Sequence, residues 1–287
     1  MTAAGRSGRL GEAGRAGRLG EAAPAGRLGE PAPAGRLGEA APAGRLGEAA
    51  PAGRLGEAEW RPASTARAEL AALAASGDSA FARLRAPLTS PGRAAAVLML
   101  FGRLDDSPAD RATGAPVSRD LDVLLVERAS TLRAHPGQIA FPGGRIDPGD
   151  ASPEAAALRE AREETGLDPD GVEVLGSLGV VPLDFSRHLV TPVLGWWRDP
   201  SPVQVVDEAE CAAVFRTPVA ELLDPSSRGV TVIRRGEIER RGPAFLLKTE
   251  AGERTLWGFT AMLLDALFDH LGWSEPWDER RELPLAL

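Results

Sequence analysis

After Trp60 the apolar residues follow two kinds of spacing, and together these predict a succession of strands and helices. Short apolar runs, rich in Val, Ile and Leu, predict strands around Ala94–Phe101, Leu121–Glu127, Val172–Val181 and His188–Trp197. Apolar residues at helical spacing predict helices over Ser64–Ala75 and within residues 256–273, LWGFTAMLLDALFDHLGW. Strands that are interleaved with helices indicate an α/β fold.

The remaining pattern fills in the connections. Residues 210–224, ECAAVFRTPVAELLD, read as a strand that runs into a short helix, and residues 230–248 read as a hairpin turning near Arg235–Gly236. Residues 103–120 form a loop by their content of Gly, Pro, Ser and Asp. We therefore predict one domain over 60–273, which includes an N-terminal helical extension, and a peripheral C-terminal tail over 274–287.

The first 59 residues show neither the strand spacing nor the helical spacing of apolar residues. Their core G-R-L-G-E recurs with a nine-residue period from Gly8 to Gly53. Each repeat offers one leucine beside two glycines, so it buries too little apolar surface to offset chain entropy. We predict a disordered, low-complexity tail over residues 1–59.

Composition and charge narrow the class of protein. The chain has 287 residues, of which 43% are hydrophobic, so a substantial core is expected. No apolar run approaches the roughly 20 residues that span a membrane, and no signal peptide is recognisable, which predicts a cytoplasmic protein without a membrane partner. The net charge of −8 disfavours nucleic-acid binding. The single Cys211 excludes an internal disulfide and fits a buried, inert thiol. We expect a monomer or a homodimer.

A capped helix follows two glycines in residues 143–167, GGRIDPGDASPEAAALREAREETGL. Ser152 is a good N-cap, Pro153 suits the first helical position, and Glu154 complements the positive end of the helix dipole. Gly166 is placed to end the helix in a left-handed conformation. The strand, the glycines and this helix predict a strand–loop–helix unit.

Three glutamates share one face of this helix. Glu160, Glu163 and Glu164 stand at i, i+3 and i+4, so their carboxylates converge within about one turn. Arg159 offsets only part of their mutual repulsion. Two interpretations stay open: a solvated, charged helix, which is the commoner meaning of such a pattern, or a platform for a hard divalent cation that faces a phosphate.

The segment resembles the signature of Nudix hydrolases, in which a glycine and a helix carrying R-E-x-x-E-E-x-G bind metal and a diphosphate. The matching positions are Arg159, Glu160, Glu163, Glu164, Gly166 and Leu167. The family also has a glutamate between the glycine and the arginine. Because Gly144 and Arg159 stand one residue further apart here, that position is Asp150 counted from Gly144, or Ala151 counted from Arg159.

Upstream, residues 124–144, LLVERASTLRAHPGQIAFPGG, resemble the motif of the coenzyme A pyrophosphatases within that family. The matching positions are Leu124, Leu125, Arg128, Ala129, Arg133, Gly137, Phe141, Pro142, Gly143 and Gly144. Val126 departs from the motif, which has Thr there. The longer spacing between Gly144 and Arg159 is also usual in this subgroup.

These resemblances imply a Nudix fold, a mixed β-sheet between helices, and a set of roles. Glu160, Glu163 and Glu164 would bind Mg²⁺ or Mn²⁺, with Arg159 orienting a carboxylate and Glu164 or Glu210 acting as the general base. Substrate contacts would come from Arg128, Arg133, His135 and Gly144. For Arg128 a surface ion pair, and for Glu210 a solvated loop carboxylate, are equally good interpretations. His188 is more often structural, though it could touch a phosphate.

The implied activity is metal-dependent hydrolysis of the diphosphate of coenzyme A or acyl-coenzyme A, giving 3′,5′-ADP and 4′-phosphopantetheine or its acyl derivative. One alternative is a diphosphatase of the same fold that acts on ADP-ribose or a dinucleotide. Another is an inactive Nudix module that senses a nucleotide.

Overall fold

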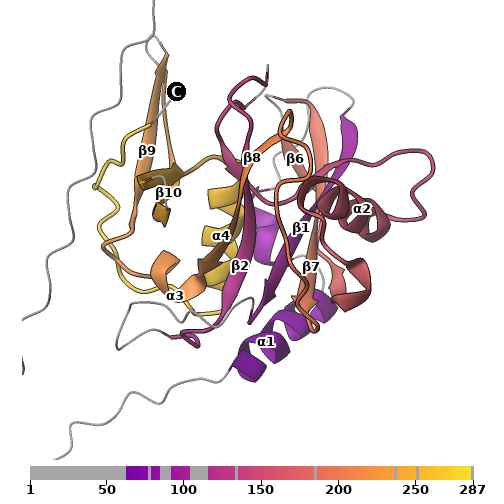
Figure 1. Ribbon diagram of the computed structural model, residues 1–287. Coiled ribbons are helices and arrows are strands. Elements are labelled where there is room, and N and C mark those ends of the chain that lie inside the picture. Colours follow the sequence, from indigo (N-terminus) through magenta and orange to yellow (C-terminus); the bar gives the residue numbers. More distant parts are fainter. Residues whose placement is uncertain are drawn as a thin grey trace, which may run out of the picture. The chain divides into compact units, whose positions relative to one another are not determined.

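The computed structural model (Figure 1) describes residues 63–76, 79–84, 92–103, 116–132, 135–183, 186–235, 238–249 and 252–285. The repeat over residues 1–59, predicted to be disordered, lies outside the described residues.

An eight-stranded mixed sheet forms the centre of the fold. Its strands are β1 (Arg93–Gly102), β2 (Asp122–Arg128), β3 (Ile139–Ala140), β4 (Gly143–Arg145), β5 (Val172–Ser177), β6 (Val181–Leu183), β7 (His188–Trp197) and β8 (Cys211–Pro218). Strands β1 and β7 run parallel, and all the other pairs in this sheet are antiparallel. Near its beginning β1 pairs with β4, while the end of β2 pairs with β3, so the chain crosses between these two central strands there.

Helices cover both faces of this sheet (Figure 1). On one face α2 (Pro153–Thr165) packs small alanines against Leu98 and Leu100 of β1. On the other face α4 (Phe259–His270) and α1 (Ala63–Ser76) pack against Met99 and Phe101, also of β1. A strand buried on both faces reads as a continuous apolar run, which is why the pattern of β1 was visible in the sequence.

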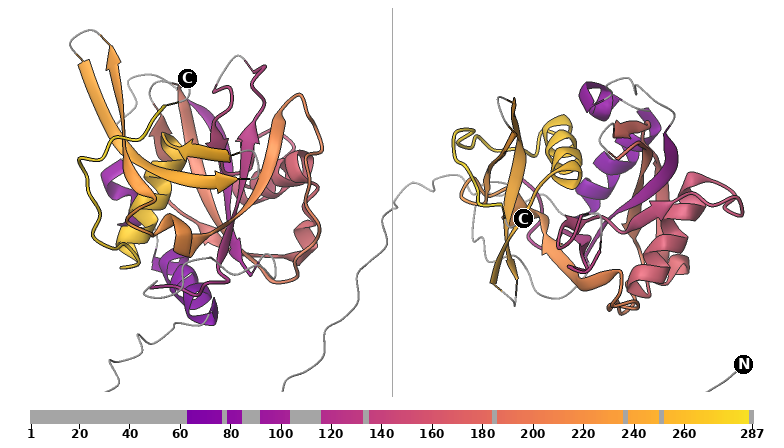
Figure 2. Two further views of the ribbon diagram at one scale, coloured as in Figure 1. Left: turned by 60° about the vertical axis from the view of Figure 1, so that its left-hand side comes forward. Right: turned by 90° about the horizontal axis from the view of Figure 1, so that it is seen from above.

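A second sheet contains β9 (Arg228–Arg235), β10 (Ile238–Thr249) and β11 (Gly252–Leu256). The two arms of the β9–β10 hairpin run side by side (Figure 2). Residues 281–283 run along β9: the Val230 N–H donates to the Arg281 carbonyl, and the Leu283 N–H donates to the Val230 carbonyl. The short elements α3 (Val219–Leu222), η1 (Ser79–Leu84) and η2 (Pro169–Gly171) complete the described structure.

The predicted elements are confirmed in most places. Strand β7 has the predicted bounds, and the strand at Cys211 runs into a short helix. The prediction of a single strand over Val172–Val181 is wrong: the pairing shifts at Gly176, whose φ is 148°, and β5 and β6 are separate. Strand β11 was not predicted. None of the helices in the described part of the chain is long and apolar enough to cross a membrane.

Candidate active site

The helix α2 begins and ends where its capping residues predict. The Ser152 hydroxyl accepts a hydrogen bond from the Ala155 N–H at 3.2 Å, and Gly166 adopts φ 70° with its N–H bonded to the Arg162 carbonyl. Alanines 156, 157 and 161 are fully buried against β1. Small side chains on this face let the helix lie close to the sheet, which brings its glutamates against β4.

Two glycines of β4 make room for this approach. A Cβ on Gly143 would lie 2.4 Å from the Ala96 carbonyl oxygen, and one on Gly144 would lie 2.5 Å from the Glu160 carboxylate. Gly143 also has a φ of 154°. The pair Gly143–Gly144 is therefore required by close packing, with Glu160 resting directly on the backbone of Gly144.

Glu164 is the most deeply buried carboxylate of the site, with 5% of its surface exposed. Its Oε2 accepts a hydrogen bond from the Gly143 N–H at 3.0 Å. Burial raises the pKa of Glu164 to about 7; the negative charges of Glu160 and Glu210 act in the same direction, and Arg128 acts against them. This carboxyl group therefore exchanges its proton near neutral pH.

Glu160 and Glu163 lie in different surroundings. Burial is the main cause that raises the pKa of Glu160 above its ordinary value, opposed by the positive charge of Arg159. Glu163 is largely exposed and accepts a hydrogen bond from Arg159 Nη1 at 2.9 Å. The helical spacing thus puts the three carboxylates in one region, but only Glu160 and Glu164 face the sheet.

Arg159 ties the loop before α2 to the helix. Its Nε and Nη2 donate to the two oxygens of Asp150 at 3.0 Å each, and Nη2 also donates to the Arg145 carbonyl at 3.0 Å. Its Nη1 lies 3.1 Å from Glu160. Hydrogen bonding to Arg159 lowers the pKa of Asp150. Of the two positions that the spacing left open for an auxiliary carboxylate, the structure places Asp150 in this ion-pair network, whereas Ala151 has only a methyl group and no oxygen to contribute.

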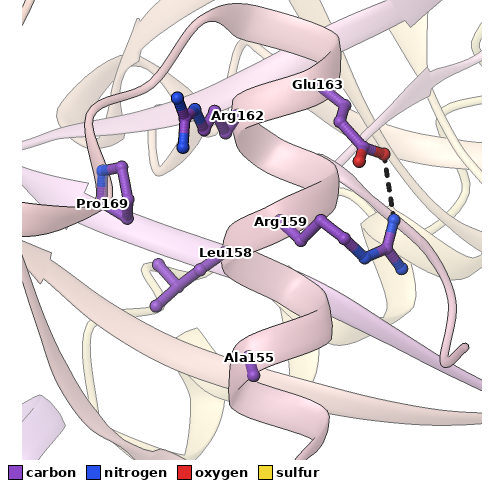
Figure 3. Close-up of a pocket in the computed structure, with 6 residues that line it drawn as sticks. All are labelled: Ala155, Leu158, Arg159, Arg162, Glu163 and Pro169. Carbon is purple, nitrogen blue, oxygen red and sulfur yellow. Dashed lines mark hydrogen bonds and ion pairs between the residues drawn. The ribbon is translucent and has the colours of Figure 1, made fainter. Parts of the chain in front are cut away.

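A hollow of about 500 Å³ lies on the outer side of α2. Figure 3 shows Arg159 directed toward Glu163 there, while Arg162 lies on the side of Pro169. Glu160 and Glu164 do not line this hollow. It is therefore beside the carboxylates that face the sheet, and we assign it no part in the chemistry.

Strand pairing brings Arg128 and Glu210 to the carboxylates of α2. Arg128 pairs with Cys211 across an irregular step at the end of β2, and the Ala129 N–H donates to the Glu210 carbonyl at 2.8 Å. Both charged groups act on the pKa of Glu164. Arg128 Nε is buried and has no hydrogen-bond partner among the described residues. A buried guanidinium nitrogen without a partner is costly unless a ligand completes it.

The neighbouring thiol fits an inert role. Cys211 is buried, and burial together with the charge of Glu164 raises its pKa to about 11. A thiol with so high a pKa carries almost no thiolate at neutral pH, so it is a poor nucleophile.

The histidines lie at the edge of the site, and Arg133 lies outside the described residues. His135 has a φ of 56°, and its Nδ1 is 2.8 Å from Gln138 Oε1. Burial lowers the pKa of His188, and the charges of Arg93 and Arg145 lower it further. Sequence reasoning named neither arginine, because only the strand register shows that both lie near His188.

The residues present suit a hard divalent cation in their chemistry. Glu160, Glu163 and Glu164 supply carboxylate oxygens, which are the ligands such a cation prefers. The Glu160 carboxylate occupies space that is free only because residue 144 is a glycine without a Cβ. In the described ranges no three such side chains are grouped closely enough to hold a metal as they stand. Arg159 contacts both Glu160 and Glu163, so a metal ion would compete with this guanidinium for the two carboxylates.

Comparisons with known proteins place the chain in a family. A model of the NUDIX domain matches residues 108–235. Over 152 residues the chain is 40% identical to the uncharacterized Nudix hydrolase NudL of Escherichia coli (strain K12), a match that covers 52% of this chain and 75% of that protein. The chain belongs to the Nudix hydrolase family. Enzymes of this family act on diphosphate bonds and generally use divalent ions such as Mg²⁺ or Mn²⁺.

Two further similarities accompany this assignment. The Nudix hydrolase NudL of Cronobacter sakazakii, also uncharacterized, is 50% identical over 102 residues, which cover 35% of this Nudix hydrolase and about half, 52%, of the relative. The NUDIX domain of Shewanella oneidensis NrtR, solved in complex with ADP ribose, has a TM-score of 0.35 and 24% identity, covering 47% of this chain and 77% of that one.

Proposed function

We propose that this Nudix hydrolase cleaves the diphosphate bond of coenzyme A or acyl-coenzyme A, giving 3′,5′-ADP and 4′-phosphopantetheine or its acyl derivative. The observation that carries the proposal is the position of Arg128. This arginine belongs to the segment that resembles the coenzyme A motif, yet its charge acts on Glu164 of the Nudix helix and its buried Nε has no partner among the described residues. A diphosphate oxygen would complete that hydrogen bond.

In this proposal Glu160, Glu163 and Glu164 would hold Mg²⁺ or Mn²⁺, and the ion would supply positive charge against the diphosphate oxygens and the leaving phosphate. Arg159 positions the carboxylates, because it joins Asp150 of the loop to Glu160 and Glu163 of the helix. Gly143 fixes Glu164 through its N–H. These contacts would orient the reacting groups before the substrate arrives, and such preorganisation accounts for much of phosphoryl-transfer catalysis.

Glu164 is the general base that the electrostatics favour. A base works best when its pKa lies near the working pH, and in the metal-free protein burial raises the pKa of Glu164 into this range. The attacking water would give its proton to a Glu164 oxygen as its own oxygen bonds to phosphorus and the bridging P–O bond breaks. Glu210 stays the second candidate, because its charge acts on both Glu160 and Glu164.

The test compares turnover of coenzyme A, dephospho-coenzyme A and ADP-ribose by the purified full chain with Mg²⁺ or Mn²⁺, with the products identified by mass. We expect coenzyme A to have the highest kcat/KM and to yield 3′,5′-ADP. A wide preference for ADP-ribose would contradict the substrate assignment. Tight nucleotide binding without metal-dependent release of a phosphate product would instead support an inactive, sensing module. We expect the enzyme to act in the cytoplasm.

A further inference from the structure

A group of cations occupies the face of the sheet opposite α2, at the end where the active-site glycines lie. Arg93 of β1 pairs with His188 of the parallel strand β7, and Ala95 of β1 pairs with Arg145 of β4. Directly paired residues project to the same face of a sheet, as do residues i and i+2 of one strand. Arg93, Arg145 and His188 therefore share one face, whereas Ala96 and Gly144 belong to the face that α2 covers.

The positive charges in this group are not compensated by the protein. Arg93 and Arg145 are exposed, and neither forms an ion pair with any carboxylate in the described parts of the chain. By contrast, Arg159 on the α2 side of the sheet forms ion pairs with Asp150, Glu160 and Glu163. In a chain with a net charge of −8, uncompensated arginines gathered at one strand end are unusual and favour binding of an anion.

Electrostatic coupling shows that the members of the group lie close together. After burial, the charges of Arg93, Arg145 and His135 are the causes that lower the pKa of His188, while the Ser186 backbone acts against them. The nearby Ser186 hydroxyl oxygen is buried and has no hydrogen-bond partner among the described residues. Two guanidinium groups, an imidazole and a hydroxyl thus lie in one small region, which is the donor set that phosphate groups use.

This region borders the active site. Arg145 directly follows Gly144, on which the Glu160 carboxylate rests, and the Arg145 carbonyl accepts the hydrogen bond from Arg159. Strand β4 is only three residues long and, among the described strands, pairs with β1 alone. Successive residues of a strand project to opposite faces, so Gly144 lies on the face of the carboxylates and Arg145 on the face of the cations. A ligand that passes the end of β4 would therefore meet both.

We propose that Arg93, Arg145 and His188 form a subsite for a phosphomonoester, separate from the position of the scissile diphosphate. Its identity as the 3′-phosphate of coenzyme A rests on the function proposed above, because in that molecule a phosphomonoester lies one ribose away from the diphosphate. The subsite would make the enzyme prefer coenzyme A to its dephospho form through ground-state binding.

The first experiment measures this preference in Arg145→Gln and Arg93→Gln. In each variant we expect the ratio of kcat/KM for coenzyme A to that for dephospho-coenzyme A to fall about tenfold, mainly through the KM for coenzyme A, since a charged hydrogen bond is lost. Arg145→Lys keeps the charge and should lose less. Arg198→Gln is the matched control, because Arg198 is an exposed arginine just beyond the other end of β7 and pairs with Asp199. An unchanged ratio in both subsite variants, or an equal fall in the control, would overturn the proposal.

The second experiment separates failure of the subsite from failure of the proposed function. Calorimetric titration of the full chain with 3′,5′-ADP, 5′-AMP and inorganic phosphate needs no hydrolysis. We expect 3′,5′-ADP to bind about tenfold more tightly than 5′-AMP, and this gain to disappear in Arg145→Gln. If coenzyme A is not hydrolysed but the gain is present and depends on Arg145, the subsite stands and the substrate assignment fails. Equal binding of the two nucleotides by the parent protein would reject the subsite.

Discussion

Two buried charged side chains in this molecule, Arg228 and Glu164, have opposite surroundings. Arg228 of β9 is fully buried, and the protein compensates it with an ion pair to Asp265, a hydrogen bond to Ser274 at 3.3 Å, and the rings of Phe245 and Trp277 at 5.0 and 4.7 Å. Glu164 of α2 is almost as deeply buried. It has one backbone hydrogen bond and the charge of Arg128 in its favour, while two other carboxylates repel it.

The difference separates a charge that supports the fold from one that supports chemistry. Arg228 has an ion pair, a hydroxyl group and two aromatic rings around its guanidinium, and its Nε alone lacks a hydrogen-bond partner among the described residues. A carboxylate whose burial and like-charged neighbours raise its pKa is destabilising in its ionised form, and such groups are typical of functional sites. We therefore expect removal of the Arg228 charge to harm stability and removal of the Glu164 charge to harm activity.

The largest effect should follow from removing a carboxylate charge on α2. In Glu164→Gln and in Glu163→Gln we expect the metal-dependent rate of coenzyme A hydrolysis to fall by about 1,000-fold, since charge stabilisation at phosphorus is worth several kcal/mol. Helix propensity hardly changes between Glu and Gln, so the fold should survive. Steady-state rates and thermal unfolding check this, with the exposed Glu253→Gln of β11 as the control. Rates near the parental value in both variants would contradict the metal platform and favour the interpretation of α2 as a solvated surface helix.

Changing Arg228 should have the opposite outcome. Arg228→Met removes the buried ion pair to Asp265, so the free energy of unfolding should fall by about 3 kcal/mol. The rate per folded molecule should stay close to the parental rate, because the partners of Arg228 lie outside the site. Arg234→Met on the same strand removes only exposed ion pairs to Glu239 and Glu282, and should cost less than about 1 kcal/mol. Urea denaturation of the two variants measures the contrast, and equal losses would contradict it.

A smaller effect should follow from filling the space beside Glu160. In Gly144→Ala the new Cβ would lie 2.5 Å from the Glu160 carboxylate, the mobile end of a side chain, so the carboxylate moves while the backbone stays. We expect the hydrolysis rate to fall about tenfold, as misplaced catalytic groups cost activity well before they cost stability. Gly149→Ala is the matched control, since a Cβ added at Gly149 would meet nothing within 4 Å. A loss of stability as large as the loss of activity would argue against a positional role.

The sequence predicted what depends on local patterns. The ends of α2 follow from Ser152 and Gly166, and the bounds of β7 follow from a continuous apolar run. The contact between Arg159 and Glu163 follows from their spacing of four residues.

What the sequence left open depends on contacts between distant segments. Helical spacing puts Glu160, Glu163 and Glu164 together, but which of them becomes buried is decided by the packing of α2 on Gly143 and Gly144. The approach of Glu210 depends on the pairing of β8 with β2. The register shift within β5 lies at Gly176, which has a positive φ and packs beside Ala74 of α1. Tertiary packing of this kind has no counterpart in a local pattern.

The most direct test of the contrast between the two charges is the stability of Glu164→Gln at two pH values, measured by thermal unfolding in the presence of a chelator. The pKa of Glu164 is raised from 4.5 to about 7 in the folded protein, so the folded state retains a proton that the unfolded chain releases. Stability contributed by this group is therefore lost as the pH rises from about 4.5 to about 7, and Gln does not suffer this loss.

A pKa raised from 4.5 to about 7 corresponds to about 3 kcal/mol at pH 8, so we expect Glu164→Gln to unfold about 6–12 °C above the parent there. At pH 4.5 the two proteins should unfold at nearly the same temperature. A Glu164→Gln protein that is no more stable than the parent at pH 8, or that is more stable by the same amount at both pH values, would contradict the claim that the protein retains a destabilising charge at this position for catalysis.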